Sequence, residues 1–369
     1  MPEQTDPDPA TPEAVDRGTS TPAADVPAVD VPAVRPAGAA AGSEGTPAAG
    51  SKLGSQRSPR SRGTLLRWAS PFVAVAIPVA LFAVAPKLYP NLLFLVTMMV
   101  YVVLAQGVNV IYGFTGYLPF GYVGFFGVGA YASSLAILDT GVPAPVGVVV
   151  GAAGAVLLGL LLSPLLRLSG AYFAIATLAA ALAVESVISN PSLAGITKGP
   201  YGIDLGSVYN ARADYVAGLV MVGLSMAVVV YLRRSRFGLA LRAIRNDPVS
   251  AAAAGVDVVK ERMLAWLISS ALAGAAGAVF AWGVSVFYPT AVFGISTSVF
   301  AIVFALFGGV GTAWGPLVGT AVLFGLYQAI GVSDPQYAQG IYGLLIVALV
   351  LFVPGGLAGV ARSIRRRRA

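Results

Sequence analysis

The sequence contains no cysteine and no histidine. Without thiols, the chain can form neither a disulfide nor a cysteine-based zinc site, and it has no thiol nucleophile. Without imidazole, it lacks the most common acid–base group of enzymes, so a Ser-His-Asp triad cannot be built. Charge is scarce too, since 11% of the 369 residues are charged, against about 25% in an ordinary soluble domain. These absences exclude several common catalytic sites and most soluble folds.

The chain is instead rich in apolar residues. Hydrophobic residues make up 57% of it, and glycine and proline number 44 and 25. A helix that crosses a bilayer needs about 20 mostly apolar residues. Ten segments meet this requirement, and they are 69–86, 92–111, 118–138, 144–166, 171–190, 214–232, 263–283, 296–311, 315–331 and 338–354. We therefore expect an all-α fold, a polytopic membrane helical bundle of about ten transmembrane helices.

Three of these segments deviate from an ordinary transmembrane pattern. Segment 118–138 is rich in glycine, while 296–311 and 315–331 are short and are joined by a Gly/Pro turn. Each could be a broken or re-entrant helix, which a membrane tolerates only where protein or a water-filled cavity surrounds it. A bundle of eight spans is therefore the alternative.

The basic residues predict an orientation, because Lys and Arg accumulate in cytoplasmic loops. With the N-terminus inside, 18 basic residues fall in cytoplasmic segments and 3 in outer ones, namely Lys87, Lys198 and Arg212. The cytoplasmic set comprises Lys52, Arg57, Arg60, Arg62, Arg67, Arg167, Arg233, Arg234, Arg236, Arg242, Arg245, Lys260, Arg262, Arg362 and Arg365 to Arg368. This distribution predicts an N-in, C-in protein with an even number of spans. It also explains the net charge of +7 without a nucleic-acid partner.

The N-terminal region differs from the rest of the chain. Residues 1–50 hold 8 acidic and 2 basic residues and contain no apolar run. Such a segment cannot bury enough surface to offset its ordering entropy. We expect a disordered cytoplasmic tail over 1–60, a transmembrane permease domain over 65–360 and a basic cytoplasmic tail over 361–369. The N-terminal tail is either a docking segment or an extension without a defined role.

The longest predicted cytoplasmic loop is 233–262, and its residues predict two short helices. Asp247 suits the N-cap of a helix, and Pro248 suits its first position. Gly255 suits the C-cap. Residues Leu239, Ala243 and Ile244 form an apolar stripe on the preceding helix, so we expect a break at Asn246–Asp247. The loop is either an ordinary basic connector or, as we interpret its internal capping, a docking surface for a partner.

This loop resembles the cytoplasmic loop of branched-chain amino acid ABC transporter permeases of the LivM type. Those permeases carry S-x-x-G-x-A-L-x-A-I-R, followed by acidic residues, small residues and glycine. The matching residues are Ser235, Gly238, Ala240, Leu241, Ala243, Ile244, Arg245, Asp247 and Gly255. The chain departs from the family at Pro248 and Ser250, where Glu and Ala are frequent, which leaves the acidic contact to Asp247 alone.

Other blocks resemble the same family in the same order. They are GFTGYLPFGYVGFFGVGAYASSLA (113–136), SGAYFAIATLAAALAVE (169–185), TKGPYGI (197–203), FGGVGTAWGPLVG (307–319) and FVPGGLAG (352–359). Together with the loop they span most of 90–360. Urea-type and sugar-type permeases share parts of this pattern, so the transported solute is less well determined than the class.

The resemblance implies the transmembrane permease subunit of an ATP-driven ABC importer, which is a transport subunit rather than an enzyme. It implies a multi-pass protein of the bacterial plasma (inner) membrane. Its expected partners are ABC ATPase subunits, a second homologous permease subunit and an extracytoplasmic solute-binding protein. No G-x-x-x-x-G-K-[ST] loop is present, so we expect no cofactor on this chain, with ATP and Mg²⁺ on the ATPases. The expected coupling residues are Arg242, Arg245, Asp247 and Gly255.

Glycines and polar side chains within the spans suggest a substrate path. Six glycines fall in 113–129, and Gly311, Gly315 and Gly319 repeat at every fourth position. They serve either close helix packing or a broken helix whose N–H groups bind a carboxylate. We expect Glu185 to be the only acidic residue inside a span, where it either faces a cavity or lies near the outer interface. The candidate path residues are Gly116, Tyr117, Tyr172, Phe173, Thr177 and Glu185.

Two alternatives to an importer of branched-chain amino acids stay open at this point. The chain could be a urea, short-amide or sugar permease of the same superfamily. It could also be a stand-alone secondary transporter or channel, although that class generally needs more intramembrane ionisable groups than this sequence contains. We expect neither a catalytic residue nor a metal site in any of these cases.

Overall fold

The computed structural model of the chain describes residues 64–333, 340, 343 and 344. The predicted tails 1–60 and 361–369 lie outside these residues, as does the block 352–359. The predicted span 338–354 lies outside them too, apart from residues 340, 343 and 344. The described elements all belong to one structural unit of the chain, residues 61–369.

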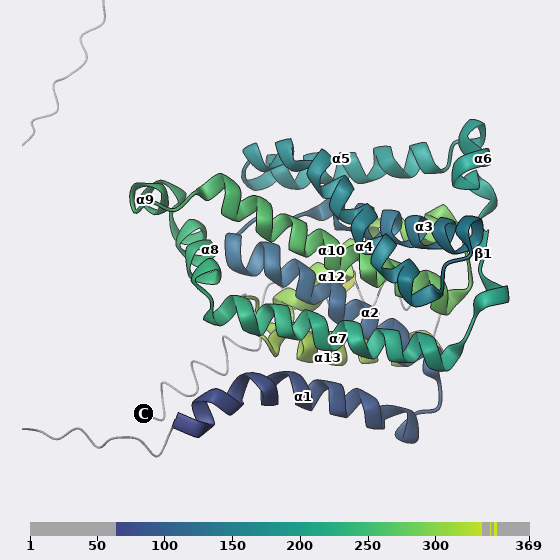
Figure 1. Ribbon diagram of the computed structural model, residues 1–369, viewed down its shortest axis with the longest axis horizontal. Helices are drawn as coiled ribbons and strands as arrows, with labels where there is room; N and C mark the ends of the chain where they lie inside the picture. Colours follow the sequence, from purple (N-terminus) through teal and green to yellow (C-terminus); the bar gives the residue numbers. More distant parts are fainter. Residues whose placement is uncertain (1–63, 334–339, 341–342, 345–369) are drawn as a thin grey trace, which may run out of the picture. The chain divides into compact units, whose positions relative to one another are not determined.

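Long helices dominate the described residues (Figure 1). They are α1 (Thr64–Leu88), α2 (Leu92–Val108), α3 (Val123–Thr140), α4 (Ala144–Leu161), α5 (Gly170–Ile188), α7 (Ala211–Arg234), α8 (Arg236–Asn246), α10 (Val258–Val284), α12 (Ile295–Gly308) and α13 (Gly315–Ser333). Shorter pieces connect them, namely the π-turn η1 (Asn109–Gly113), η2 (Phe120–Tyr122), η3 (Ser163–Arg167), η4 (Pro191–Leu193), α6 (Ala194–Thr197), η5 (Gly199–Tyr201), β1 (Ile203–Asp204), η6 (Gly206–Val208), α9 (Pro248–Ala253), β2 (Val286–Phe287) and α11 (Pro289–Val292).

Helices cover nine of the ten segments that the sequence predicts as spans. Within the described part of the chain, seven helices are long and apolar enough to cross a membrane. They are Leu92–Gly113, Phe120–Thr140, Ala144–Leu161, Gly170–Ile188, Ala211–Arg234, Val258–Val284 and Pro289–Gly308. The all-α prediction is therefore confirmed for a polytopic helical membrane protein, while the count of ten and the N-in orientation stay predictions.

One predicted boundary is wrong. The sequence pattern extends a span to residue 166, whereas α4 ends at Leu161 and the chain continues as the 3-10 turn η3. Pro164 explains this ending, because proline has no backbone N–H and clashes with the preceding helical turn. The glycine-rich segment 118–138 is covered from residue 120 onward by the helical stretch Phe120–Thr140, in which the 3-10 turn η2 leads into α3 across a kink with non-helical backbone at Gly121.

Helix α10 lies in the middle of the described bundle and packs against α2, α3, α4 and α7 (Figure 1). Glycine allows the closest of these approaches. A β-carbon on Gly277 of α10 would lie 1.9 Å from the carbonyl oxygen of Phe126, and one on Gly129 of α3 would lie 2.2 Å from that of Gly274. Helices in lipid associate by such close packing, so the glycines at the α3–α10 crossing serve the fold.

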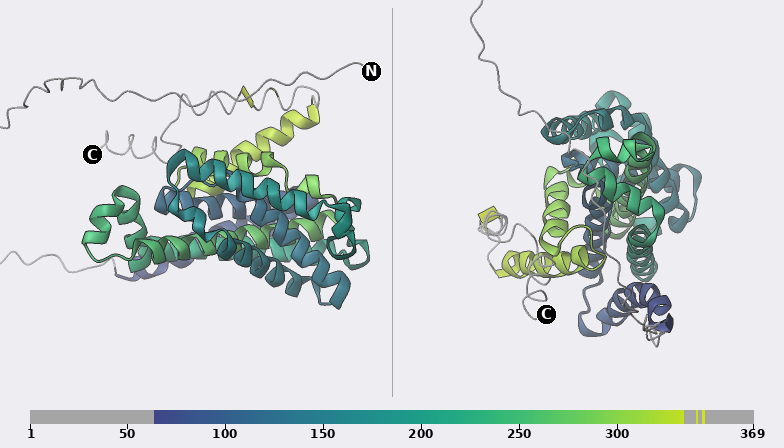
Figure 2. Two further views of the ribbon diagram at one scale, coloured as in Figure 1. Left: turned by 90° about the horizontal axis from the view of Figure 1, so that it is seen from above. Right: turned by 90° about the vertical axis from the view of Figure 1, so that its left-hand side faces the viewer.

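The two ends of the bundle differ in charge and structure. One end, which we call the basic end, carries α8 and α9 and the turns 114–119, 162–169 and 309–314 (Figures 1 and 2). Its basic residues include Arg167, Arg233, Arg234, Arg236, Arg242, Arg245, Lys260 and Arg262. At the opposite end, β1 pairs with β2 in antiparallel fashion through Ile203 and Phe287, and Lys198 lies 3.7 Å from Asp139.

Candidate coupling segment and pocket

The segment α8–α9 is built by its own capping residues, as the sequence predicts. The Ser235 hydroxyl accepts a hydrogen bond from the Gly238 N–H (3.1 Å) at the start of α8. The Asp247 carboxylate accepts one from the Val249 N–H (2.9 Å) at the start of α9. Pro248 is the first residue of α9; its C-cap is Ala254 rather than the predicted Gly255, which follows as the next residue with a φ of +86°. The predicted break at Asn246–Asp247 is confirmed.

The predicted apolar stripe on α8 is wrong at one position. Of its three predicted members, Ile244 is buried and Ala243 is partly buried, whereas Leu239 is 62% exposed. Leu241, which is not part of the predicted stripe, is buried. The reason is the tight turn after α7, in which a β-carbon on Gly238 would lie 1.7 Å from the carbonyl oxygen of Leu232. This contact rotates α8 so that positions 238, 241 and 244 face inward and Leu239 faces away from the bundle.

Besides Gly255, which follows α9, the three other predicted coupling residues occupy different environments. Arg242 stays near α8, where its Nε donates to the Gly238 carbonyl (3.1 Å). Arg245 turns toward α2, where it donates to the carbonyl oxygen of Gly113. Asp247 is exposed, and its pKa is held below its ordinary value first by the Ser250 hydroxyl and then by backbone N–H groups. The coupling role of these residues stays a prediction.

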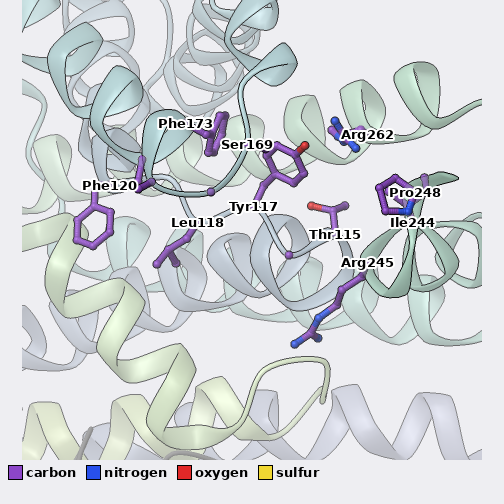
Figure 3. A pocket seen from close by; sticks show the side chains of 14 residues that line it. Thr115, Tyr117, Leu118, Phe120, Ser169, Phe173, Ile244, Arg245, Pro248 and Arg262 are labelled. Atoms are coloured by element: carbon purple, nitrogen blue, oxygen red, sulfur yellow. The ribbon is translucent and has the colours of Figure 1, made fainter. Parts of the chain in front are cut away.

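A pocket of about 420 Å³ opens at the basic end between this segment and the bundle (Figure 3). The 115–120 turn, the start of α5, α8, Pro248 and Arg262 line it. The Tyr117 ring lies between two groups: the Arg262 guanidinium is 4.2 Å from its centroid, and the Phe173 ring is 5.1 Å away. Arg262 also donates to the Leu166 carbonyl (3.2 Å). The pocket therefore combines cationic groups with apolar walls.

The structure brings three of the six candidate path residues together. Gly116, Tyr117 and Phe173 line the pocket, and Gly116 has a φ of +83°. Thr177 is buried one turn along α5, where its hydroxyl donates to the Ala174 carbonyl (2.8 Å). Thr177 therefore lies one turn beyond Phe173 and does not itself line the pocket.

The other two candidates do not reach the pocket. Tyr172 is 76% exposed and lies on the outer face of α5. Glu185 is partly buried near the far end of α5, about 18 Å from Phe173 at 1.5 Å per residue. Their place in a substrate path stays a prediction that this geometry does not support.

Several buried polar residues escaped the sequence analysis. The statement that Glu185 is the only acidic residue inside a span is wrong, because Asp214 lies in α7 and is 2% exposed. Gln106 and Asn109 are fully buried in the apolar stretch Leu92–Gly113. The sequence pattern that could have identified them is a polar side chain within an apolar run. Burying such a group in a membrane costs free energy, so its presence indicates a role in function or packing.

The apolar helices and the basic end define a polytopic, integral membrane protein. A family model described as branched-chain amino acid transport system / permease component matches residues 91–351. The chain belongs to this family and is a permease subunit of an ABC importer.

Three relatives illustrate the similarity. The chain is 29% identical to the high-affinity branched-chain amino acid transport system permease protein LivM of Salmonella typhimurium, over 72% of this chain and 69% of the relative. It is 28% identical to the probable branched-chain amino acid transport permease protein LivH of Methanocaldococcus jannaschii, over 74% and 90%. It is 30% identical to the fructose import permease protein FrcC of Rhizobium meliloti, over 38% and 41%. No solved structure matches the chain.

Proposed function

We propose that this permease subunit carries branched-chain or related small amino acids inward across a bacterial inner membrane. A binding protein outside would deliver the amino acid, and a second, homologous permease subunit would complete the path. Separate ATPase subunits inside would hold ATP and Mg²⁺, and this chain would bind no cofactor itself. The family match and the similarity to LivM and LivH proteins support the substrate class and these partners.

The observation that carries the proposal is the position of α8–α9 at the basic end of the bundle (Figure 1). Basic residues mark the cytoplasmic side of a membrane protein, which is the side where ATPases bind. The segment also exposes apolar side chains, because Leu239 and Val249 both face away from the bundle. Exposed apolar groups on a polar surface are typical of protein contacts. We therefore assign the outer face of α8–α9 to the ATPase.

The pocket supports a link between the α8–α9 segment and the substrate path. Ile244, Arg245 and Pro248 of the coupling segment form one side of it, while α5 and the 115–120 turn form the other. A movement of α8–α9 would therefore change the shape of the pocket directly. Its cationic and apolar groups suit an amino acid with a carboxylate and an aliphatic side chain. In this proposal the pocket is the inner end of the path on this subunit.

The docking surface can be tested by co-purification of the ATPase with the permease. We expect the wild-type chain to retain the ATPase and both Leu239→Glu and Val249→Glu to lose most of it, because each places a charge in an apolar contact. Val286→Glu is the matched control, since Val286 is an exposed valine in β2 at the opposite end. Equal retention by all three variants, or no ATPase with the wild type, would contradict the docking assignment.

The substrate class needs a separate experiment on the assembled transporter in proteoliposomes. We expect radiolabelled leucine uptake that depends on ATP and on the binding protein, and competition by isoleucine and valine. Urea and fructose serve as competitors of the two alternative solute classes. Competition by either of them, without competition by valine, would move the assignment to a urea-type or sugar-type permease.

A further inference from the structure

Two buried amide side chains lie where α2 changes into the π-turn η1. Gln106 and Asn109 are fully buried, and the Asn109 amide donates to the Gln106 side-chain oxygen (Nδ2 to Oε1, 3.2 Å). Gln106 also donates to the sulfur of Met226 in α7 (2.9 Å). Buried amides inside a membrane helix are costly unless they are paired, and π-turns within helices are frequent at functional sites.

These two amides hold the turn 309–314 between α12 and α13. The Gly311 N–H donates to Asn109 Oδ1 (2.6 Å), and Asn109 Nδ2 donates to the Thr312 carbonyl (2.8 Å). Gln106 Nε2 donates to the Ala313 carbonyl (2.7 Å). The turn leaves regular helix geometry because Gly311 has a φ of +76°, so its backbone groups need partners from elsewhere. The amides on α2 supply partners for three consecutive residues.

The coupling segment holds the same π-turn from the other side. The Arg245 guanidinium donates to the carbonyl oxygen of Gly113, the last residue of η1. It also lies 5.9 Å from the ring centroid of Tyr112. Gly113 in turn packs directly on the 309–314 turn, since a β-carbon on Gly113 would lie 2.8 Å from the Gly311 nitrogen. The π-turn is therefore enclosed between α8 and the turn 309–314.

We propose that Asn109 is a positioning residue that joins the turn 309–314 to the coupling segment, so that movement of α8 reaches α13 through η1. The connection is continuous and short: Arg245 binds Gly113, and Asn109 binds Gly311 four residues before α13 begins. Energetic coupling between sites passes through such packed and hydrogen-bonded contacts. This proposal rests on the proposed function, because it requires that ATPases act on α8–α9.

The test is the variant Asn109→Leu in the full complex, reconstituted in proteoliposomes with the ATPase and the binding protein. Leucine has nearly the size of asparagine but no polar atom, so it removes the acceptor for Gly311 and the donor to Thr312 and Gln106. We expect leucine uptake to fall about 10-fold, which corresponds to about 1.4 kcal/mol of lost coupling, while ATP hydrolysis stays unchanged. The number of ATP molecules consumed per leucine should therefore rise by the same factor.

The matched control is Tyr122→Phe, which also removes buried hydrogen bonds: Tyr122 Oη donates to the Ser269 carbonyl (2.8 Å) and accepts from the Ser269 hydroxyl (3.3 Å). These bonds lie outside the Asn109 network, so the ratio of ATP hydrolysis to uptake should stay at the wild-type value. A merely structural role for Asn109 would lower uptake and hydrolysis together, and that result would overturn the proposal. A wild-type complex without leucine uptake would instead contradict the proposed function.

A second measurement needs no buried substitution. The sequence has no cysteine, so spin labels can be placed at Ala252→Cys on α9 paired with Val318→Cys on α13, all exposed sites. The reference pair joins Ala252→Cys to Leu157→Cys on α4. We expect a non-hydrolysable ATP analogue to change the α9–α4 distance and to leave the α9–α13 distance unchanged. An equal change in both pairs, or no change in either, would overturn the proposal.

Discussion

Substitution of Gly277 by alanine tests whether close packing of α10 on α3 holds the bundle together. A β-carbon at this position would lie 1.9 Å from the carbonyl oxygen of Phe126. Ordinary contact begins near 3.4 Å, so the two backbones would have to separate by about 1.5 Å. The opposing atom belongs to the backbone of a helix, so no side-chain rotation can relieve the overlap.

The expected loss of stability follows from two opposing effects. Overpacking of a well-packed core costs about 1–3 kcal/mol, and the upper end applies here because two helices must move. The better helix propensity of alanine offsets this loss of stability by up to about 1 kcal/mol. We therefore expect Gly277→Ala to lower the free energy of unfolding by about 2 kcal/mol.

The assay is thermal unfolding of the purified protein in detergent, with Gly325→Ala as the matched control. Gly325 also lies within a helix, α13, but a β-carbon there would meet nothing within 4 Å. The same chemical change should then raise the free energy of unfolding by up to about 1 kcal/mol. Gly277→Ala unfolding at or above the wild-type temperature would refute the packing argument.

Three further predictions concern single side chains. Ser250 and backbone N–H groups lower the pKa of Asp247 in the folded state. The stability that this cap gives to α9 is therefore complete above the unfolded-state pKa and is lost as the pH falls through the folded-state pKa. The protection factors of the α9 amides, which correct for the intrinsic pH dependence of exchange, should fall in acid, and Asp247→Asn should remove this fall; protection factors that stay constant with pH in the wild type would contradict it. Gly283→Ala would place a β-carbon 2.5 Å from Asp214 Oδ2, so thermal unfolding should show a loss of about 1–3 kcal/mol that disappears in an Asp214→Ala background; additive effects would contradict the contact. Phe173→Ala should cost about 3–5 kcal/mol in the same assay because the ring is fully buried, and a loss below about 1 kcal/mol would show that the pocket wall collapses around the smaller side chain.

Local sequence patterns predicted the two helices of the α8–α9 segment in detail. The break at Asn246–Asp247, the capping positions of Asp247 and Pro248 and the end of α9 near Gly255 all follow from backbone chemistry within a few residues. Such preferences act over one helical turn and do not need the rest of the protein. The sequence did not predict which face of α8 is buried, because the close contact of Gly238 with Leu232 sets the rotation of the helix.

The facing of residues within the spans could not be predicted in the same way. Lipid and protein interior are both apolar, so a membrane helix carries little periodic contrast between its buried and exposed sides. Tyr172 and Phe173 are neighbours in the sequence and equally plausible as path residues. The structure exposes the first and buries the second, because α5 contacts the bundle along a single narrow face.

The sequence by itself determined the class of protein, nine helical segments and the caps of α8 and α9, since hydropathy, charge distribution and capping are local properties. The tertiary structure alone decided which polar groups meet. Asn109 and Gly311 are separated by 202 positions in the chain and form one hydrogen bond, and Arg245 closes the same cluster through Gly113. These partners depend on how α2, α8 and α13 pack, and a pattern within one helix holds no information about its neighbours.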